Sequence, residues 1–261
     1  MEAVVRSRWQ AAILDALREQ KRARIRALAA RLGISDETVR RHLRELVAQG
    51  MVRREHGFAI WSGPPEEPPF DQRLRLRAEA KRAIAARLAE LVQDGQTLMM
   101  DTGSTTAYVA EALAGRRELT VITNGIEIAR SLVGRNGHRV YLAGGELKAE
   151  LAAAVGVEAL SFVGQFRADL AILSIAAVHP EHGLMNFALD EARIARAMME
   201  RAQRTVLVAD HSKFGARAVV RVAALEEVHL LVTDRPLAAP FARSLREAGV
   251  EVVIAAPDQP R

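Results

Sequence analysis

A proline-rich segment separates two regions of this 261-residue chain that differ in their sequence pattern. Residues 62–70 read SGPPEEPPF, with four prolines and two glutamates. Proline lacks a backbone N–H and fixes φ, so such a segment continues neither a helix nor a central strand. We therefore expect an extended linker at residues 62–70, between a small domain at residues 1–61 and a larger domain at residues 71–261.

The excess positive charge is confined to the first region. Residues 1–60 hold 13 Lys and Arg against 7 Asp and Glu, whereas the other 201 residues hold 24 against 25. A basic head on a neutral body is typical of a protein that binds nucleic-acid phosphates, although a solvated basic helix surface would look the same. The chain has no cysteine, which excludes disulfides, thiolate metal sites and cysteine nucleophiles.

No stretch of the sequence is typical of a targeting segment, a membrane span or a metal site. The opening MEAVVRSRWQ lacks the apolar core of a signal peptide, and no run approaches the roughly 18 apolar residues of a spanning helix. The one close histidine pair, His179 and His182, has no further ligands nearby in the sequence. We expect a soluble cytoplasmic protein with no membrane partner and no metal.

Residues 25–50 have the pattern of a helix-turn-helix. Gly33 ends a first helix, and Ser35 is a good N-cap for a second. At about 100° per residue, Thr38, Arg41 and Arg44 point away from the core, with Arg40 on the flank. The predicted inward stripe of the second helix is Val39, Leu43, Leu46 and Val47.

An exposed basic helix of this kind suits the major groove of DNA, where Arg bonds guanine and Thr contacts a thymine methyl. Residues 51–54 and 58–61 would pair around a turn at 55–57 as a wing that meets the phosphate backbone. A plain two-helix corner is the alternative, but the wing and the charge asymmetry favour double-stranded DNA as the partner. The predicted DNA-binding residues are Ser35, Thr38, Arg40, Arg41, Arg44, Arg53 and Arg54.

After the linker, apolar runs alternate with amphipathic stretches. This alternation predicts βαβ units and an α/β fold, with a Rossmann-like parallel sheet covered on both faces. Residues 71–92 are expected to form one amphipathic helix that packs on the sheet, or joins head to body, or contributes to a dimer. The predicted strands are residues 97–101, 119–123, 139–143, 169–175, 205–210, 229–234 and 250–256.

The sequence DTGSTT at residues 101–106 follows a predicted strand and opens a helix. Unpaired backbone N–H groups at a helix start, together with three hydroxyls, can hold a phosphate, although an ordinary polar turn would also explain this loop. The motifs G-x-x-x-x-G-K-[ST] and G-x-G-x-x-G are absent, which argues against nucleotide triphosphate hydrolysis and a dinucleotide cofactor.

Other polar residues follow predicted strands and should converge on the same crevice, because parallel strands present their carboxyl ends on one side. Asn124 can bond a hydroxyl, a glycine pair permits close approach, and Glu146 can accept a hydroxyl proton. Lys213 offers a cation to a phosphate, although by itself it could be a solvated lysine. The predicted ligand-binding residues are Asp101, Gly103, Ser104, Thr105, Thr106, Asn124, Gly144, Gly145, Glu146 and Lys213.

The string TVRRHLRELVAQGMVRREHG resembles the winged helix-turn-helix of the DeoR family of transcriptional regulators. The strings DTGSTT, VITN, LAGGEL, VADHSKFG and residues 166–169 resemble the sensor domain of that family, so the likeness extends from about Val5 onward. It implies a sensor fold similar to ribose-5-phosphate isomerase and the coenzyme A transferases, and phosphorylated sugars or related intermediates as effectors. Residues 183–220 look most like the glycerol-3-phosphate regulon repressor branch. His42 and Phe58 depart from the Asp and Gly that are usual in the family.

We therefore expect a DNA-binding repressor of a carbohydrate or glycerol operon, acting as a homo-oligomer, dimer or tetramer, on paired half-sites. A phosphorylated sugar or a glycerol-3-phosphate-like effector would release it from the operator, and no enzymatic activity is expected. The alternative is a sugar-phosphate isomerase in which Asp101, Glu146 or Asp210 is the base and Lys213 orients the substrate. An isomerase has no need of the basic head. A third alternative is a structural DNA-binding protein whose body binds no ligand.

Overall fold

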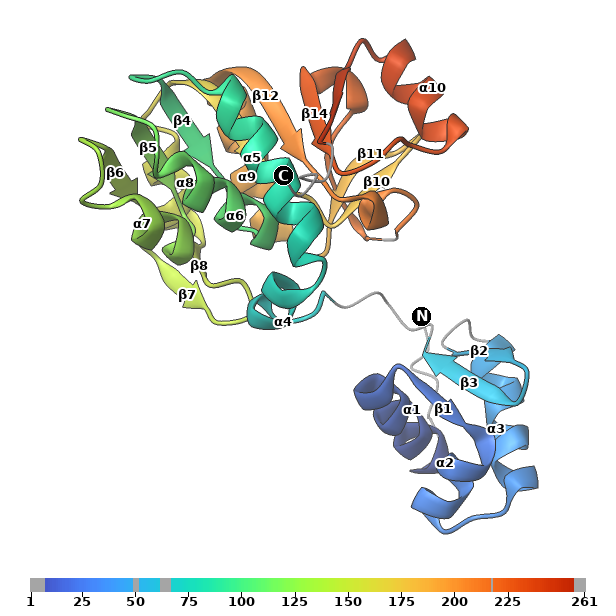
Figure 1. Ribbon diagram of the computed structural model, residues 1–261. Coiled ribbons are helices and arrows are strands. Elements are labelled where there is room, and N and C mark those ends of the chain that lie inside the picture. Colours follow the sequence, from blue (N-terminus) through green and yellow to red (C-terminus); the bar gives the residue numbers. More distant parts are fainter. Residues whose placement is uncertain (1–7, 49–51, 62–66, 217, 256–261) are drawn as a thin grey trace, which may run out of the picture. The chain divides into compact units, whose positions relative to one another are not determined.

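The computed structural model describes residues 8–48, 52–61, 67–216 and 218–255 (Figure 1). The chain divides into two compact units, one within residues 1–65 and the other within residues 66–261. Each unit has its own hydrophobic core. Of the helices in the described ranges, none is long and apolar enough to cross a membrane.

The N-terminal unit packs three helices against a three-stranded sheet in the order β1-β3-β2. Its core is formed by apolar residues from all three helices, including Leu17, Leu28 and Leu43, which are at most 1% exposed. The helix-turn-helix expected from the sequence is confirmed as α2 and α3. The elements are α1 Arg8–Gln20, β1 Arg22–Arg24, α2 Ile25–Leu32, α3 Asp36–Ala48, β2 Val52–Glu55 and β3 Phe58–Trp61.

The turn between α2 and α3 depends on two residues. Gly33 adopts a left-handed φ of 66°, which glycine reaches without steric cost, and thereby ends α2. Oγ of Ser35 accepts a 3.1 Å hydrogen bond from the backbone N–H of Thr38 and caps α3. In α3, Val39, Leu43 and Leu46 are fully buried as expected, but Val47 is 40% exposed. Val47 lies about 80° around the helix from Val39, at the edge of the apolar stripe.

The wing is an antiparallel hairpin in which Val52 pairs with Trp61 and Glu55 with Phe58. Its turn has two residues, His56 and Gly57, both with positive φ, as in a type I′ turn. Glu55 therefore belongs to the strand and not to the turn, whereas Met51 lies outside the described residues. The sequence did not predict β1, which pairs with β3 on its other side.

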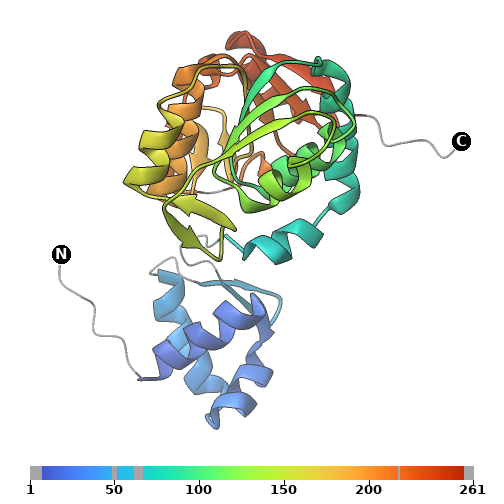
Figure 2. The same ribbon diagram turned by 90° about the vertical axis from the view of Figure 1, so that its left-hand side faces the viewer.

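The C-terminal unit is built on a parallel seven-stranded sheet in the order β15-β14-β12-β9-β4-β5-β6. Every strand of this sheet falls in one of the seven predicted runs or overlaps it, and the expected α/β class is confirmed. Helices cover both faces (Figure 2). The strands are β4 Thr97–Met100, β5 Thr120–Thr123, β6 Arg139–Leu142, β9 Ala168–Leu173, β12 Ala202–Val208, β14 Leu230–Thr233 and β15 Glu251–Ile254.

Alternate residues of the five inner strands belong to two separate cores. Met99 belongs to the core beneath α8 (Val157–Val163), α9 (Leu189–Arg201) and α10 (Ala239–Glu247). Met100 belongs to the core beneath α5 (Ala78–Leu91), α6 (Ser104–Leu113) and α7 (Ile126–Leu132). This is the arrangement expected of a strand whose side chains alternate between two buried faces.

Where the sequence predicted one helix at residues 71–92, the structure has two, α4 (Phe70–Arg75) and α5. Leu76 is extended and Arg77 is left-handed, with φ 54°. The break turns α4 so that Phe70 is buried, while Ile84 and Leu88 of α5 face the sheet; Leu91 is 39% exposed. Phe70 thus begins a helix of the second unit, and its N–H donates to the Glu150 carbonyl over 3.0 Å.

Several short elements beside the main sheet were not predicted. A small antiparallel sheet has the order β10-β11-β13, and β7 and β8 form a separate hairpin. Isolated runs of three or four residues carry too little periodicity to be recognised in the sequence. They are β7 Glu146–Lys148, β8 Ala153–Val155, β10 Ala177–His179, β11 Gly183–Asn186, β13 Val220–Ala223, and the 3₁₀ turns η1 His211–Lys213 and η2 Leu225–Glu227.

Candidate functional site

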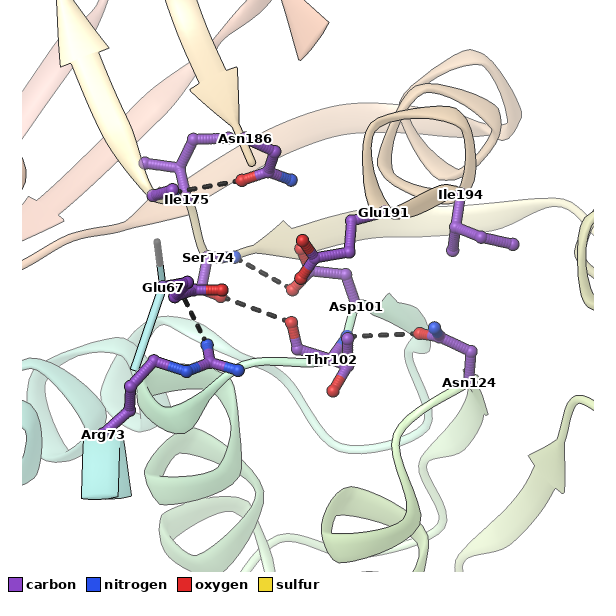
Figure 3. Close-up of a pocket in the computed structure, with 11 residues that line it drawn as sticks. Glu67, Arg73, Asp101, Thr102, Asn124, Ser174, Ile175, Asn186, Glu191 and Ile194 are labelled. Carbon is purple, nitrogen blue, oxygen red and sulfur yellow. Dashed lines mark hydrogen bonds and ion pairs between the residues drawn. The ribbon is translucent and has the colours of Figure 1, made fainter. Parts of the chain in front are cut away.

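A polar pocket lies at the carboxyl ends of the central parallel strands β4, β5 and β9 (Figure 3). This is the edge of an open α/β sheet at which ligands usually bind. The pocket is small, with room for about one water molecule. Its lining residues are Glu67, Arg73, Asp101, Thr102, Asn124, Ser174, Ile175, Ala176, Asn186, Glu191 and Ile194.

Two buried asparagines fix the shape of this pocket. Oδ1 of Asn124 accepts from the N–H of Thr102 over 3.1 Å, and Nδ2 donates to the Ala154 carbonyl over 3.0 Å. Asn186 accepts from the N–H of Ala176 over 3.1 Å. Both side chains tie neighbouring segments together, so the pocket walls are held by hydrogen bonds as well as by the sheet.

Two acidic side chains, Asp101 and Glu191, meet in the pocket (Figure 3). Burial raises the pKa of Asp101 well above its ordinary value, and the charge of Glu191 raises it further. Burial raises the pKa of Glu191 to about 7, with the charge of Glu67 acting in the same direction. A carboxyl group that stays protonated near neutral pH can donate a hydrogen bond to a ligand hydroxyl.

Four cationic side chains gather near the same pocket. Arg73 forms a 3.1 Å ion pair with Glu67, and Nε of Arg77 lies 3.7 Å from Oδ1 of Asp210. Burial lowers the pKa of Lys213, while Glu67 and Asp210 oppose this shift. Burial also lowers the pKa of Lys81, to about 8, and Lys213, Arg73 and Arg77 lower it further. These mutually repelling cations would be relieved by a bound anion.

The structure brings together only part of the predicted ligand-binding set. Asp101 and Asn124 line the pocket, and Lys213 is coupled electrostatically to Glu67, which also lines it. Gly103 follows Thr102 directly and is the N-cap of α6. Of the other predicted residues, Gly144, Gly145 and Glu146 are exposed next to the edge strand β6, and Ser104, Thr105 and Thr106 are buried in the first turn of α6. These six do not line the pocket, and neither do Gly103 and Lys213.

The placement of these six residues has physical reasons. The edge strand β6 leads through Gly144 and Gly145 into β7, which leaves the sheet to pair with β8. The two glycines therefore do not turn toward the central strands of the sheet. Oγ1 of Thr106 donates to the carbonyls of Asp101 and Gly103 over 2.9 and 3.0 Å. That hydroxyl therefore stabilises the loop itself.

Sequence reasoning missed several residues at the site. The cations Arg73, Arg77 and Lys81 recur every four residues, and this spacing was an available signal for a basic stripe. Glu191 stands in the first turn of a helix, where an acid is common for unrelated reasons. Glu67 lay in the predicted linker, where nothing in the sequence distinguished it from its neighbours.

The N-terminal unit presents the predicted basic surface on α3 and β2. Arg40, Arg41 and Arg44 of α3 are exposed, as are Arg53 and Arg54 of β2. Their ion pairs, Arg44 with Glu37 at 3.6 Å and Arg53 with Glu55 at 3.9 Å, are solvent-exposed and therefore weak. Ser35 is exposed at the helix cap and Thr38 is half-buried beside it.

Two residues that depart from the family pattern lie close to this surface. His42 is 8% exposed, and both ring nitrogens lack a hydrogen-bond partner within the described ranges. Phe58 begins β3, and the guanidinium of Arg22 lies 3.8 Å from the centre of its ring, a cation–π contact. The aromatic ring therefore joins the first and third strands of the wing sheet.

Comparison with known proteins gives relatives over most of the chain. A glycerol-3-phosphate regulon repressor of Escherichia coli (strain K12) is 34% identical over 224 residues, which is 86% of this chain and 89% of the relative. The transcriptional regulator GlpR of Haloferax volcanii is 38% identical over 88% of this chain and 90% of its own. The transcriptional repressor AccR of Agrobacterium fabrum is 37% identical over 86% and 88%.

Among solved structures, ribose-5-phosphate isomerase A of Methanocaldococcus jannaschii is 18% identical, with a TM-score of 0.38 over 51% of this chain and 53% of its own. Two family matches cover both units. Residues 9–62 match the DeoR-like helix-turn-helix domain, and residues 76–235 match the DeoR C-terminal sensor domain. The chain belongs to the DeoR family of helix-turn-helix regulators.

Proposed function

We propose that this chain is a transcriptional repressor that binds operator DNA through its N-terminal unit and is released by a phosphorylated metabolite bound in its C-terminal unit. The relatives named as repressors support this proposal. The observation that supports it best is the set of side chains at the pocket. Arg73 lines the pocket and Lys213 is coupled to it, whereas Asp101 and Glu191 supply carboxyl groups that can be protonated. An anionic group and a hydroxylated carbon chain are the two halves of a ligand that such a site would recognise.

For the effector we propose glycerol 3-phosphate or a sugar phosphate, with Lys213 and Arg73 holding the phosphate. The N–H groups that open α6, at residues 103–106, would add donors to the phosphate. Protonated Asp101 or Glu191 would donate to a hydroxyl of the ligand. Gly144, Gly145 and Glu146 would enter the site only if the β6–β7 connection moved toward it.

For the DNA we propose that α3 enters the major groove and that β2 meets the phosphate backbone. Arg40, Arg41 and Arg44 would contact bases and phosphates, with Ser35 and Thr38 at the start of the helix. Arg53 and Arg54 would contact the backbone from the wing. Paired half-sites would require a homo-oligomer, a dimer or a tetramer.

The effector role is tested with Lys213→Ala. The variant should bind operator DNA like the wild type but lose release by glycerol 3-phosphate. A hundredfold loss of effector response corresponds to about 2.7 kcal/mol of differential binding, which is within reach of one phosphate site. Lys148→Ala is the matched control, because Lys148 pairs with Asp190 and is coupled to Glu146 and Glu150, whereas Lys213 is coupled to the pocket residue Glu67. An unchanged response in Lys213→Ala would refute the role of Lys213.

We also propose that the chain has no isomerase activity, since the named relatives are regulators. Incubation with pentose and hexose phosphates, followed by NMR, tests this. Turnover that disappears in an Asp101→Asn variant would overturn the proposal.

A further inference from the structure

We infer that the carboxylate of Glu67 is a built-in anion that occupies the phosphate side of the effector site and is displaced when the effector binds. The inference rests on the proposed effector site and adds how that site is regulated. Glu67 stands where the segment after β3 enters the second unit, six residues after Trp61, the last residue of β3. Its displacement would therefore free the end of this segment from the sensor unit.

Arg73 is bound to the segment that contains Glu67. Nη1 of Arg73 pairs with Glu67 at 3.1 Å, Nε donates to the Pro68 carbonyl over 2.9 Å, and Nη2 donates to the Glu150 carbonyl over 3.3 Å. The Arg73 and Glu67 side chains are only 9% and 13% exposed. Two of the three guanidinium nitrogens that make these contacts therefore bind residues 67–68. A phosphate that captured Arg73 would compete with both of these contacts.

The charge of Glu67 acts on the other ionisable groups at the pocket. The Glu67 carboxylate favours the charged form of Lys213 and raises the pKa values of Asp101 and Glu191. It therefore neutralises the same cations that a phosphate would use. A dianionic phosphate and the Glu67 carboxylate would repel one another in this poorly solvated space.

The pocket is too small for a phosphate as it stands. The pocket has room for about one water molecule, so a phosphate can enter only if a lining side chain moves away. Asp101 and Ser174 are joined by a hydrogen bond at strand ends, and Glu191 lies on α9. Glu67 belongs to no helix or strand. Asp101 also lies outside the strands, but Ser174 holds it at the end of β4, whereas Glu67 is held by Arg73, with which a phosphate can pair instead. Glu67 is therefore the charged lining residue that a phosphate would displace.

The affinity test compares Glu67→Gln with the wild type by calorimetric titration of glycerol 3-phosphate and inorganic phosphate into the full-length protein. Because the amide cannot neutralise Arg73, both anions should bind about tenfold more tightly, or about 1.4 kcal/mol. Glu79→Gln is the control, since Glu79 is exposed on α5 and its substitution removes the same charge. Equal affinity in Glu67→Gln and wild type would overturn the inference.

Release of the segment is tested by hydrogen exchange at the Phe70 amide, which donates to the Glu150 carbonyl. Glycerol 3-phosphate should speed exchange at this amide in the wild type, whereas ordinary stabilisation by a ligand would slow it. Slower exchange would overturn the inference. Loss of binding in Lys213→Ala with no effect of Glu67→Gln would refute this inference alone. An absence of glycerol 3-phosphate binding to the wild type and to Glu67→Gln would refute the proposed effector with it.

Discussion

The backbone N–H of Ser174 donates a 2.9 Å hydrogen bond to Oδ1 of Asp101 and so ties the end of β9 to the end of β4. Gly103 packs against the same serine. A Cβ on Gly103 would lie 1.8 Å from Oγ and 2.8 Å from Cβ of Ser174. The loop that opens α6 can therefore approach β9 only because residue 103 has no side chain.

Gly103→Ala should destabilise the sensor unit by about 1–3 kcal/mol, the usual range for overpacking a closed site. Urea unfolding measures the loss. Gly115→Ala is the matched control, because the nearest atom to its added Cβ would lie 3.9 Å away. Adding Ser174→Gly should recover part of the loss, since the two sites are in contact. A Gly103→Ala protein that unfolds at the wild-type urea concentration would show that the loop can yield.

Glu191 makes stability fall as the pH rises. Its pKa is about 7 in the folded chain against 4.5 ordinarily, so between these values the folded state binds more protons than the unfolded state. Stability from this group is then fully present below about pH 4.5 and is lost by about pH 7, at a cost of about 3 kcal/mol. Glu191→Gln should flatten this slope in urea unfolding measured across the same pH range. A slope as steep as that of the wild type would assign the titration to another group.

The main sheet could be predicted because it is buried on both faces. A strand such as β14 reads as an apolar run that is buried throughout, and the helices between strands have the 3.6-residue period. The break at Arg77 left no such trace, since its left-handed φ falls on an arginine and not on a glycine. Val47 was predicted to face inward but is exposed, because the residues at the edge of an apolar stripe are buried only if another element packs against them.

The candidate site was predicted where it follows from topology. Asp101 and Asn124 stand directly after adjacent parallel strands, so their convergence is a consequence of the sheet. Glu67 and Arg73 reach the pocket from outside the sheet, through α4 and the segment before it. Glu146 was expected there because its strand ends on the same side, but the lateral order of strands puts β6 at the edge.

Arg41→Ala should weaken operator binding by about 1–3 kcal/mol if Arg41 reads a base from the major groove. Arg41 is exposed on α3, so its removal should leave thermal stability unchanged. Arg117→Ala in the sensor unit removes an equal charge from an exposed position and serves as the control. Gel-shift titration against specific and scrambled duplexes measures both affinity and preference. Affinity and preference equal to those of the wild type would place Arg41 outside the DNA interface.

Effector binding should take up protons above pH 7.5 through Lys81. Its pKa of about 8 reflects burial and the neighbouring cations, so a bound phosphate would raise it and favour the charged form. The phosphate monoester is already a dianion there, because its second pKa is about 6. Affinity for glycerol 3-phosphate should therefore fall as the pH rises from about 7.5 to 9, by a few-fold to about tenfold for one coupled group.

Calorimetry at pH 8.5 in two buffers of different ionisation enthalpy counts these protons directly. Lys81→Arg keeps the charge and should remove the share of Lys81 from the uptake, leaving that of Lys213, whose pKa burial also lowers. Lys148→Arg, at a residue that pairs with Asp190, should leave the uptake unchanged. Glu191 would also take up protons, but with its pKa near 7 its share shrinks toward pH 9 while that of Lys81 grows. Wild-type affinity that stays constant across this range would show that the phosphate does not bind near Lys81.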